Sequence, residues 1–545
     1  EGGNLALLAL AKRLTRKVPS LYKFLGVIGM LGGSLFFADA VITPAISVMS
    51  AIEGLEIVRP ALSDFIIPLS LSILFMLFAM QHYGTSHIGK LFGPVMLVWF
   101  TTLGVLGVYN IMQTPEVLQA VSPHYAWMFF LEHPALSFWT LGAAILVVTG
   151  AEALYADMGH FGRKPIQIGW FLFVWPCLLL NYFGQSALLI RVPQSIENPF
   201  YLMAPQWFLM PLLILSTMAT IIASQAVITG TFSVVRQAIL LGYLPRLQIQ
   251  HTSDHTKGQI YIPTVNWLLF ITIAILVLSF QNSSALAAAY GMAVSGNMLM
   301  TTLLFCVVSR MLWRWSWPAV IAFGGIFVTV EIFLLTANVI KIAHGAWLPL
   351  ALSAILVLLF STWSRGQQLL NDQRRQHSVP PETYVKTLEE KTCARVHGTA
   401  FYLGRQRGMV PPSFMTQIKH TRALHEQVIF LTIQIDESPY LLSRERCEFH
   451  DLGKGFKRLI LHYGFKEIPD LARDLELCRG QGLNFNMEHS SFFLGSESIV
   501  PTAGYGMPIW RDWIFMMMKR NSGDVVSYLN LPHDRVVELK SQHIV

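Results

Sequence analysis

The stretch GVIGMLGGSLFFADAVITPAISVMSAIEGLE, residues 26–56, stays apolar for longer than one bilayer crossing requires. A transmembrane helix needs about 20 mostly apolar residues. Asp39 lies well inside this stretch, whereas its other two carboxylates, Glu53 and Glu56, lie at its end. Ionised side chains at membrane depth are costly and usually mark an ion or proton path. The stretch therefore predicts a spanning helix that holds a candidate functional carboxylate.

The rest of the chain shows the same apolar character up to about Trp363. The whole sequence is 53% hydrophobic and only 13% charged, too apolar for a soluble globule throughout. We predict ten spans, all α-helical, centred near residues 36, 72, 101, 147, 178, 225, 270, 298, 328 and 355. Most of the chain must therefore face the lipid bilayer.

The composition changes abruptly at Arg365. From there to the end lie 23 of the 39 Lys and Arg and 20 of the 32 Asp and Glu, with no apolar run of spanning length. Residues 399–403 and 428–435 alternate like strands, a helix is predicted over 411–426, and a later strand over 486–494. Residues 1–364 are thus predicted as a transmembrane domain and 365–545 as an α/β packing or regulatory domain.

The loops between the predicted spans carry an asymmetric charge. One side has thirteen Lys and Arg and the other only Arg59, Arg191 and Lys341. Short cytoplasmic loops collect basic residues, so we expect both the chain start and the C-terminal domain on the cytoplasmic side. This topology also explains the net charge of +7 without nucleic-acid binding. All five cysteines are expected to be reduced, because no CxxC pair occurs.

The centre of the first span is rich in oxygen ligands. Thr43 follows Asp39 by four residues and shares its helix face, while Pro44 frees a main-chain carbonyl near residue 40. Carboxylate, hydroxyl and carbonyl oxygens together suit a hard, weakly hydrated cation. The alternative is a buried Asp39 satisfied by the neighbouring hydroxyl. Gly29, Gly32 and Gly33 form a small-residue face suited to close helix contact.

The fourth span, LGAAILVVTGAEALYADMGHFGRKP at 141–165, contains a polar insert. Gly150 and Gly159 bracket Glu152, Tyr155 and Asp157, and Thr149 precedes them. A helix that breaks there can present carbonyls and half-helix ends to an ion, as in secondary transporters. For Asp157 and His160, a hydrogen-bonded pair at the membrane interface is the alternative.

Two further spans hold polar groups. Glu331 lies in IAFGGIFVTVEIFLLTANVI at 321–340 with no hydroxyl cluster beside it in the sequence, and it could carry a proton or pin two helices together. In the sixth span Ser216, Thr220, Ser224 and Gln225 lie along roughly one helix side, where helix packing is the favoured reading. No HExxH, phosphate loop or GxSxG motif occurs, so we expect neither an enzyme nor a cofactor.

Several runs resemble a known family: ITPAISVMSAIEGLE (42–56), EALYADMGHFG (152–162), NYFGQ (181–185), ASQAVITG (223–230), GQIYIP (258–263) and LAAAYG (286–291). They are similar to the low-affinity bacterial Kup branch of the KUP/HAK/KT potassium-uptake family, over essentially the whole chain. The resemblance implies twelve helices on the inverted-repeat amino acid-polyamine-cation superfamily scaffold. The first two family helices are expected to be missing from this N-terminally truncated chain. It also implies proton-coupled potassium uptake across a bacterial inner membrane, and it leaves room for a homodimer.

The resemblance also implies site residues. Asp39 matches the acidic residue of a YGE triplet, here Phe37-Ala38-Asp39, while Glu152 and Asp157 match unchanged and Glu331 falls where Asp is frequent. We expect Asp39 and Glu152 as potassium ligands, with Thr43, Thr149 and Tyr155 near the ion and Asp157 and Glu331 as further proton-coupling candidates. An amino acid or polyamine transporter and a channel-like conduit are the alternatives. A channel would predict a TVGYG-like filter, which the sequence lacks. A membrane sensor would need an output motif in 365–545, and none is found.

Overall fold

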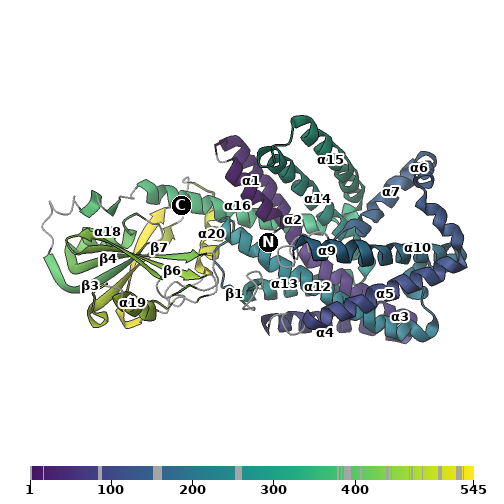
Figure 1. Cartoon of the computed structure of the whole chain (residues 1–545), viewed down its shortest axis with the longest axis horizontal. Helices are drawn as coiled ribbons and strands as arrows, with labels where there is room; N and C mark the ends of the chain where they lie inside the picture. Colours follow the sequence, from purple (N-terminus) through teal and green to yellow (C-terminus); the bar gives the residue numbers. More distant parts are fainter. Residues whose placement is uncertain are drawn as a thin grey trace. The chain divides into compact units, whose positions relative to one another are not determined.

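The chain divides into two compact units, Glu1–Leu241 with Gln248–Phe360 and Gly242–Leu247 with Ser361–Val545 (Figure 1). The computed structural model describes residues 3–15, 17–83, 89–150, 162–251, 260–376, 380–381, 383–385, 394–404, 408–436, 441–442, 445–464, 467, 470–480, 483–500, 506–522, 531 and 533–544.

In its described residues, the first unit is helical apart from a two-stranded ribbon, β1 (Gln250–His251) with β2 (Ile260–Tyr261). Its α-helices are α1 (Gly3–Leu14), α2 (Pro19–Ile52), α3 (Gly54–Val58), α4 (Ile66–Met80), α5 (Gly89–Gln113), α6 (Pro123–Glu132), α7 (Pro134–Ala144), α9 (Arg163–Gly169), α10 (Trp175–Arg191), α11 (Pro199–Leu202), α12 (Leu209–Leu240), α13 (Pro263–Phe280), α14 (Ser283–Met311), α15 (Trp317–Val339) and the first part of α16 (Trp347–Gln376), which belongs to the second unit from Ser361 onward. Short turns join them: η1 (Pro60–Phe65), η2 (Gln81–Tyr83), η3 (Pro115–Val121), η4 (Ile145–Val148), η5 (Trp170–Val174, a π-helical turn), η6 (Pro193–Glu197), η7 (Gln206–Phe208) and η8 (Ile340–His344).

Nine helical segments within the described ranges are long and apolar enough to cross a membrane. They correspond to nine of the ten predicted spans. The remaining span, centred near residue 147, begins as the shorter apolar helix Pro134–Val147 and then enters residues 151–161, outside the described part. The multi-span helical region is confirmed, and the count of ten stays a prediction.

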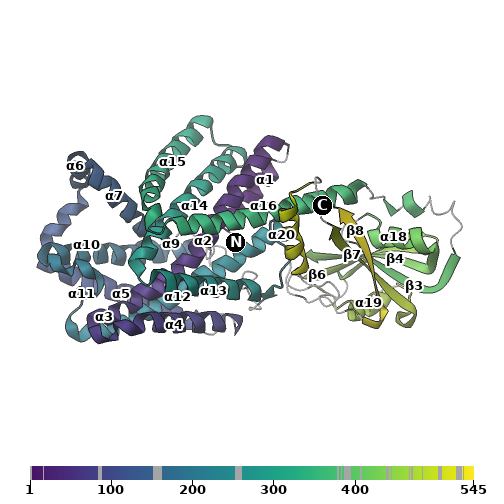
Figure 2. The ribbon, with the colours of Figure 1, turned by 180° about the vertical axis from the view of Figure 1, so that it is seen from behind.

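Helix α2 is the most enclosed spanning helix. In the most apolar stretch of this spanning segment, Pro19–Val58, 83% of the residues are buried, whereas 6–50% are buried in the corresponding stretches of the other spanning segments. Helices α1, α4, α12, α13 and α14 pack around it (Figure 2). Leu8, Asn4 and Leu5 of α1 lie against Gly29, Gly32 and Gly33, where a Cβ atom would collide with each of them. This contact confirms the small-residue face predicted from the sequence.

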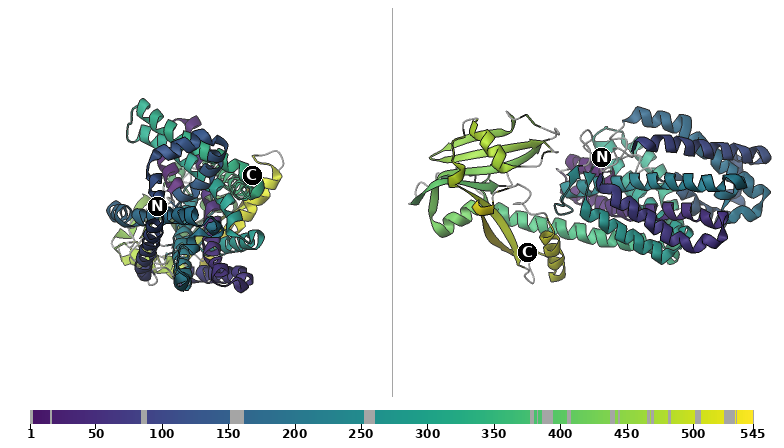
Figure 3. Two further views of the ribbon diagram at one scale, coloured as in Figure 1. Left: turned by 90° about the vertical axis from the view of Figure 1, so that its right-hand side faces the viewer. Right: turned by 90° about the horizontal axis from the view of Figure 1, so that it is seen from below.

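Figure 3 shows the β-sheet on which the second unit is built. In the part of this unit that the structure describes, the sheet has six strands in the order β5-β6-β4-β3-β7-β8, and only the β5–β6 pair is antiparallel. The strands are β3 (Ala394–Gly404), β4 (Ala423–Asp436), β5 (Cys447–Gly453), β6 (Phe456–Gly464), β7 (Ser490–Val500) and β8 (Val536–Ile544), and the helices α18 (Pro412–Thr421), α19 (Leu471–Gly480) and α20 (Ile509–Arg520). Alternate strand residues feed two cores, one with α19 and the other with α18. The predicted α/β domain is confirmed as a mixed sheet flanked by helices.

Two predicted elements of this domain have different bounds. The helix expected to reach residue 426 ends at Thr421, where Arg422 takes a left-handed conformation with φ 51°, and residues 423–426 begin β4. The later strand starts at Ser490, because Met487–His489 form a 3-10 turn, η10. Strands β5, β6 and β8 were not predicted.

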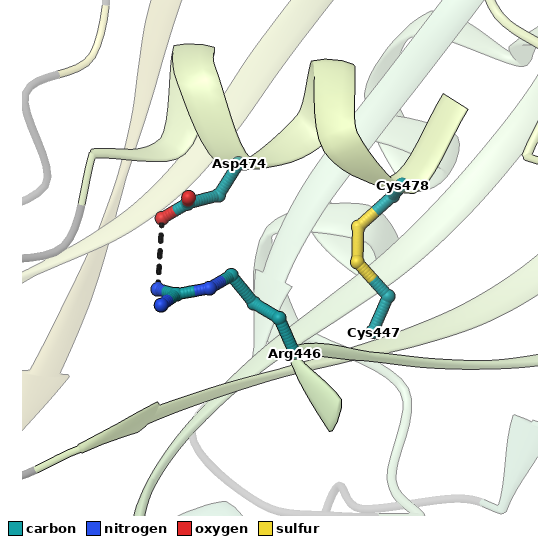
Figure 4. Close-up of a disulfide and its surroundings, with 4 residues drawn as sticks. All are labelled: Arg446, Cys447, Asp474 and Cys478. Carbon is teal, nitrogen blue, oxygen red and sulfur yellow. Dashed lines mark hydrogen bonds and ion pairs between the residues drawn. A yellow bond between two sulfur atoms is a disulfide. The ribbon is translucent and has the colours of Figure 1, made fainter. Parts of the chain in front are cut away.

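A disulfide joins Cys447 at the start of β5 to Cys478 in α19 (Figure 4). The expectation that all five cysteines are reduced is therefore wrong for this pair. The two residues are separated by 31 positions, and the packing of α19 on the sheet brings their Cα atoms to 5.8 Å, within the usual disulfide range. Cys177 and Cys306 are free, and Cys393 lies outside the described residues. Beside the bond, Arg446 forms a buried ion pair with Asp474 at 3.4 Å.

Candidate functional site

Asp39 lies inside α2 with only 6% of its surface exposed. The Thr43 hydroxyl lies 3.0 Å from both Oδ1 and the main-chain oxygen of Asp39, and it can donate to either. Pro44 sits inside the helix and has no amide hydrogen, so the Ala40 carbonyl lacks its usual helical donor. A carboxylate, a hydroxyl and a main-chain carbonyl thus gather within one turn of α2. The alternative, a purely structural role for Asp39, would require the same hydrogen bond from Thr43 to the Asp39 carboxylate.

Glu331 of α15 is also buried, with 4% of its surface exposed. Thr302 of α14 donates a hydrogen bond of 2.7 Å to its Oε1 atom. The Oε2 atom has no hydrogen-bond partner among the described residues. The sequence shows no hydroxyl cluster beside Glu331, and the single hydroxyl that bonds to it comes from a neighbouring helix 29 residues earlier.

The two carboxylates lie at different depths of the helix bundle. Helices α2 and α14 run antiparallel, since Glu53 accepts from the Ser283 amide at one end and Gly32 lies against Met300 toward the other. By this register Thr302 lies level with residue 30 of α2. That is nine residues from Asp39, or about 13 Å at 1.5 Å per residue. The structure does not join Asp39 and Glu331 into one site.

Thr149 marks the end of the helical part of the fourth span. Helix α7 tightens into η4, Thr149 is extended, and Gly150 has φ +92°. The Thr149 hydroxyl donates to the Leu146 carbonyl at 3.0 Å. The expected break in the helix is therefore present on this side. Glu152, Tyr155, Asp157 and His160 lie outside the described residues.

Polar pairs between helices were missed from the sequence. Gln225 of α12 exchanges two hydrogen bonds with Gln81 of η2, and Asn4 of α1 donates to Asn297 of α14 at 3.0 Å. The sequence of α12 identifies Gln225 as a polar residue of the span, but it does not identify the partner Gln81, which lies 144 positions away. These amides hold helices together, as do many polar groups in membrane bundles.

Tyr201 contacts the C-terminal end of α2. Its hydroxyl lies 2.7 Å from the Ala51 carbonyl and 2.6 Å from Ser216, and its ring covers Gly54. The packing role favoured for Ser216 agrees with this contact. The described residues contain no cluster of three or more His, Cys, Asp or Glu.

Comparison with known proteins gives a consistent result over both units. Residues 1–368 match the K+ potassium transporter integral membrane domain, and residues 397–544 match the K+ potassium transporter C-terminal domain. The chain is 49% identical over 540 residues to the probable potassium transport system protein Kup 1 of Aeromonas hydrophila, covering 99% of this chain and 86% of that protein. It is 47% identical over 542 residues to the probable potassium transport system protein Kup of Rhodopseudomonas palustris, covering 99% and 87%. The chain therefore belongs to the Kup family of potassium transporters, and it is a multi-pass membrane transporter and not an enzyme.

Proposed function

We propose that this protein takes up potassium across a bacterial inner membrane together with protons, as a K+:H+ symporter. The relatives are described as potassium transport proteins, and the proton is the part that this proposal adds. The observation that carries the proposed potassium site is the buried carboxylate Asp39 in α2, with the Thr43 hydroxyl and the carbonyl freed by Pro44 beside it.

Asp39 is proposed to bind potassium as a carboxylate ligand. Potassium sheds water on entering such a site, and oxygen ligands of the protein take its place. Glu152 is proposed as the second carboxylate ligand, and Thr149 and Tyr155 as neutral oxygens nearby. The extended Thr149 and the positive φ of Gly150 support a non-helical segment there, the kind that lines ion sites in secondary transporters.

Glu331 is proposed as a proton carrier, with Asp157 as a second candidate. An ionised carboxylate buried with one unpartnered oxygen is costly. A proton on Oε2 removes the charge and leaves the Thr302 bond to Oε1 in place. The depth difference from Asp39 supports separate proton and potassium positions.

The proposal includes an architecture and an orientation. Residues 1–364 would form the transport domain on the amino acid-polyamine-cation superfamily scaffold, and residues 365–545 would face the cytoplasm. The basic loops support this orientation. A homodimer is part of the proposal only as an assembly to be measured.

The decisive experiment measures potassium influx in bacteria that lack their own uptake systems, using the full-length protein. Influx is compared at acidic and neutral pH, with and without a protonophore. We expect influx to rise in acid, to collapse with the protonophore and to fall at least about tenfold in Asp39→Asn, because the variant loses the charge that faces the ion.

Glu56→Gln is the matched control, because Glu56 is an exposed carboxylate in α3 outside the enclosed part of α2. It should transport like the unmodified protein. Influx indifferent to pH and protonophore would reject proton coupling. Full influx in Asp39→Asn would remove Asp39 from the site.

A further inference from the structure

Helix α20 of the second unit has an apolar face that its own domain leaves exposed. Ile509, Trp510, Trp513 and Met517 are 47%, 54%, 59% and 58% exposed. Residues 510, 513 and 517 follow an i, i+3, i+7 spacing and share one side of the helix. Other exposed large apolar residues in the described part of this domain are scattered singly over strands and loops. Two exposed tryptophans on one short helix indicate a binding surface.

The opposite face of α20 packs on residues 361–366, near the middle of α16. The Phe515 ring lies 5.1 Å from the Trp363 ring and covers Gly366. Arg511 donates to Thr362 at 2.9 Å and to Ser361 at 3.0 Å. Figure 2 shows α20 alongside α16. These contacts fix α20 to a defined stretch of α16, residues 361–366.

That stretch of α16 is where the last spanning helix changes from apolar to polar. Residues 347–363 contain no charged side chain, and Arg365 is the first. A spanning helix leaves the hydrocarbon core where its charged residues begin. Helix α20 is therefore attached to α16 at the depth of the membrane–water interface.

The charges on α20 agree with this depth. Its only acidic residue, Asp512, is completely buried, whereas Arg520 is exposed and Lys519 half-buried at the C-terminal end. The outer surface thus combines tryptophans and apolar residues with a basic C-terminal end. This combination is typical of helices that lie in the plane of an anionic bilayer, and tryptophan is enriched at that level.

We propose that α20 is an interfacial membrane helix, whose Trp510, Trp513 and Met517 face insert among the lipids beside α16. The occupant of the exposed face is the bilayer that already surrounds the spanning helices. Lipid contact by α20 does not depend on potassium or proton transport. The C-terminal domain would then have two attachments to the membrane, α16 and α20.

The test uses the full-length protein in nanodiscs of phosphatidylethanolamine and phosphatidylglycerol. Cys177, Cys306 and Cys393 are replaced by Ser, and single cysteines Trp510→Cys, Trp513→Cys and Met517→Cys are labelled with the fluorophore NBD. Lys419→Cys is the matched control, because Lys419 is exposed on α18 of the same domain. We expect brominated lipid chains to quench the α20 labels by about twofold or more, and to leave the Lys419 label unchanged.

Equal fluorescence in plain and brominated lipids, with iodide quenching as strong as at Lys419, would overturn the proposal. Protection from iodide without quenching by brominated lipid, together with cross-links between two copies, would also overturn it and assign the face to a protein partner. Three independent label positions keep the test decisive if one variant fails to assemble. Assembly is checked by gel filtration against the unmodified protein.

Discussion

At the scale of single residues, the bond between Thr302 and Glu331 is the interaction that the sequence hides most completely. Thr302→Val keeps the side-chain volume and removes the donor at 2.7 Å. Glu331 would then have two unpartnered oxygens in a buried position. A buried group left without its partner costs about 1–3 kcal/mol. We predict a lower melting temperature for purified Thr302→Val and a reduced rate of potassium influx.

Thr301→Val is the control, because within the part of the chain that the structure describes the Thr301 hydroxyl bonds only to the Asn297 carbonyl of its own helix, at 2.9 Å. It should change the melting temperature little. The double variant Thr302→Val, Glu331→Gln should lose less stability than the sum of the two single variants, since residues in contact are not additive. Strict additivity would show that the bond does not form in the membrane.

Asp512 predicts a pH dependence of the C-terminal domain. Burial raises the pKa of this carboxyl above its ordinary value of 3.8, and the neighbouring Arg511 only partly opposes the shift. Below pH 3.8 the carboxyl is protonated in both the folded and the unfolded chain, so its burial has no charge cost. As the pH rises through the raised folded pKa, the buried group must ionise and stability is lost.

Asp512→Asn should therefore raise the melting temperature of the C-terminal domain at pH 8 by about 2–4 °C, which corresponds to about 1 kcal/mol for a domain of this size. The gain should shrink toward pH 4. The measurement is thermal unfolding of the detergent-purified protein over this pH range. Asp372→Asn, at an exposed position of α16, should show no such trend. A pH-independent gain would point to packing and not to ionisation.

At the scale of elements, helices α5 and α10 touch through their backbones at two glycines. A Cβ atom at Gly107 would lie 2.3 Å from the Leu180 carbonyl oxygen, and one at Gly184 would lie 2.6 Å from the Gly107 Cα atom. Backbone cannot move aside as a flexible side chain can. Gly107→Ala should therefore separate the helices and destabilise the protein by about 1–3 kcal/mol, the usual cost of overpacking.

The matched control for this prediction lies in the same helix. Gly93 of α5 has nothing within 4 Å of the position of a Cβ atom, so Gly93→Ala should leave the amount of folded protein unchanged. Both variants can be compared by fluorescence-detected gel filtration of membrane extracts. Similar yields for the two variants would contradict the close crossing.

The helices and strands also show which structural features can be predicted from the sequence. Spanning helices follow from apolar length, because lipid offers the backbone no other hydrogen-bond partners. The predicted helix before β4 is too long because residues 423–426 are compatible with either a helix or a strand. No sequence signal indicates that Arg422 adopts the left-handed conformation that ends the helix. Thr302 and Cys478 were missed because their partners are distant in the chain and are brought near only by packing.

At the scale of the whole molecule, the distribution of basic residues predicts which side of the membrane each loop faces. Thirteen Lys and Arg lie in the loops on one side and three on the other. Such a bias sets the orientation of multi-pass proteins. A green fluorescent protein fused after residue 545 should therefore fluoresce, since it folds only in the cytoplasm. Alkaline phosphatase fused after Gln113, at the end of α5, should be active, since it folds only outside.

Active phosphatase at the C-terminus would reverse the orientation and with it the proposed position of the C-terminal domain. The Cys447–Cys478 bond adds a second measurement to this prediction, because disulfides are uncommon in a reducing cytoplasm. Cys478 has no exposed surface, which restricts the access of a reducing thiol to the bond. We expect the pair to resist alkylation in intact cells until the domain is unfolded. Rapid alkylation of both cysteines in folded protein would mean that the bond is open in the cell, and would leave the orientation to the reporter fusions alone.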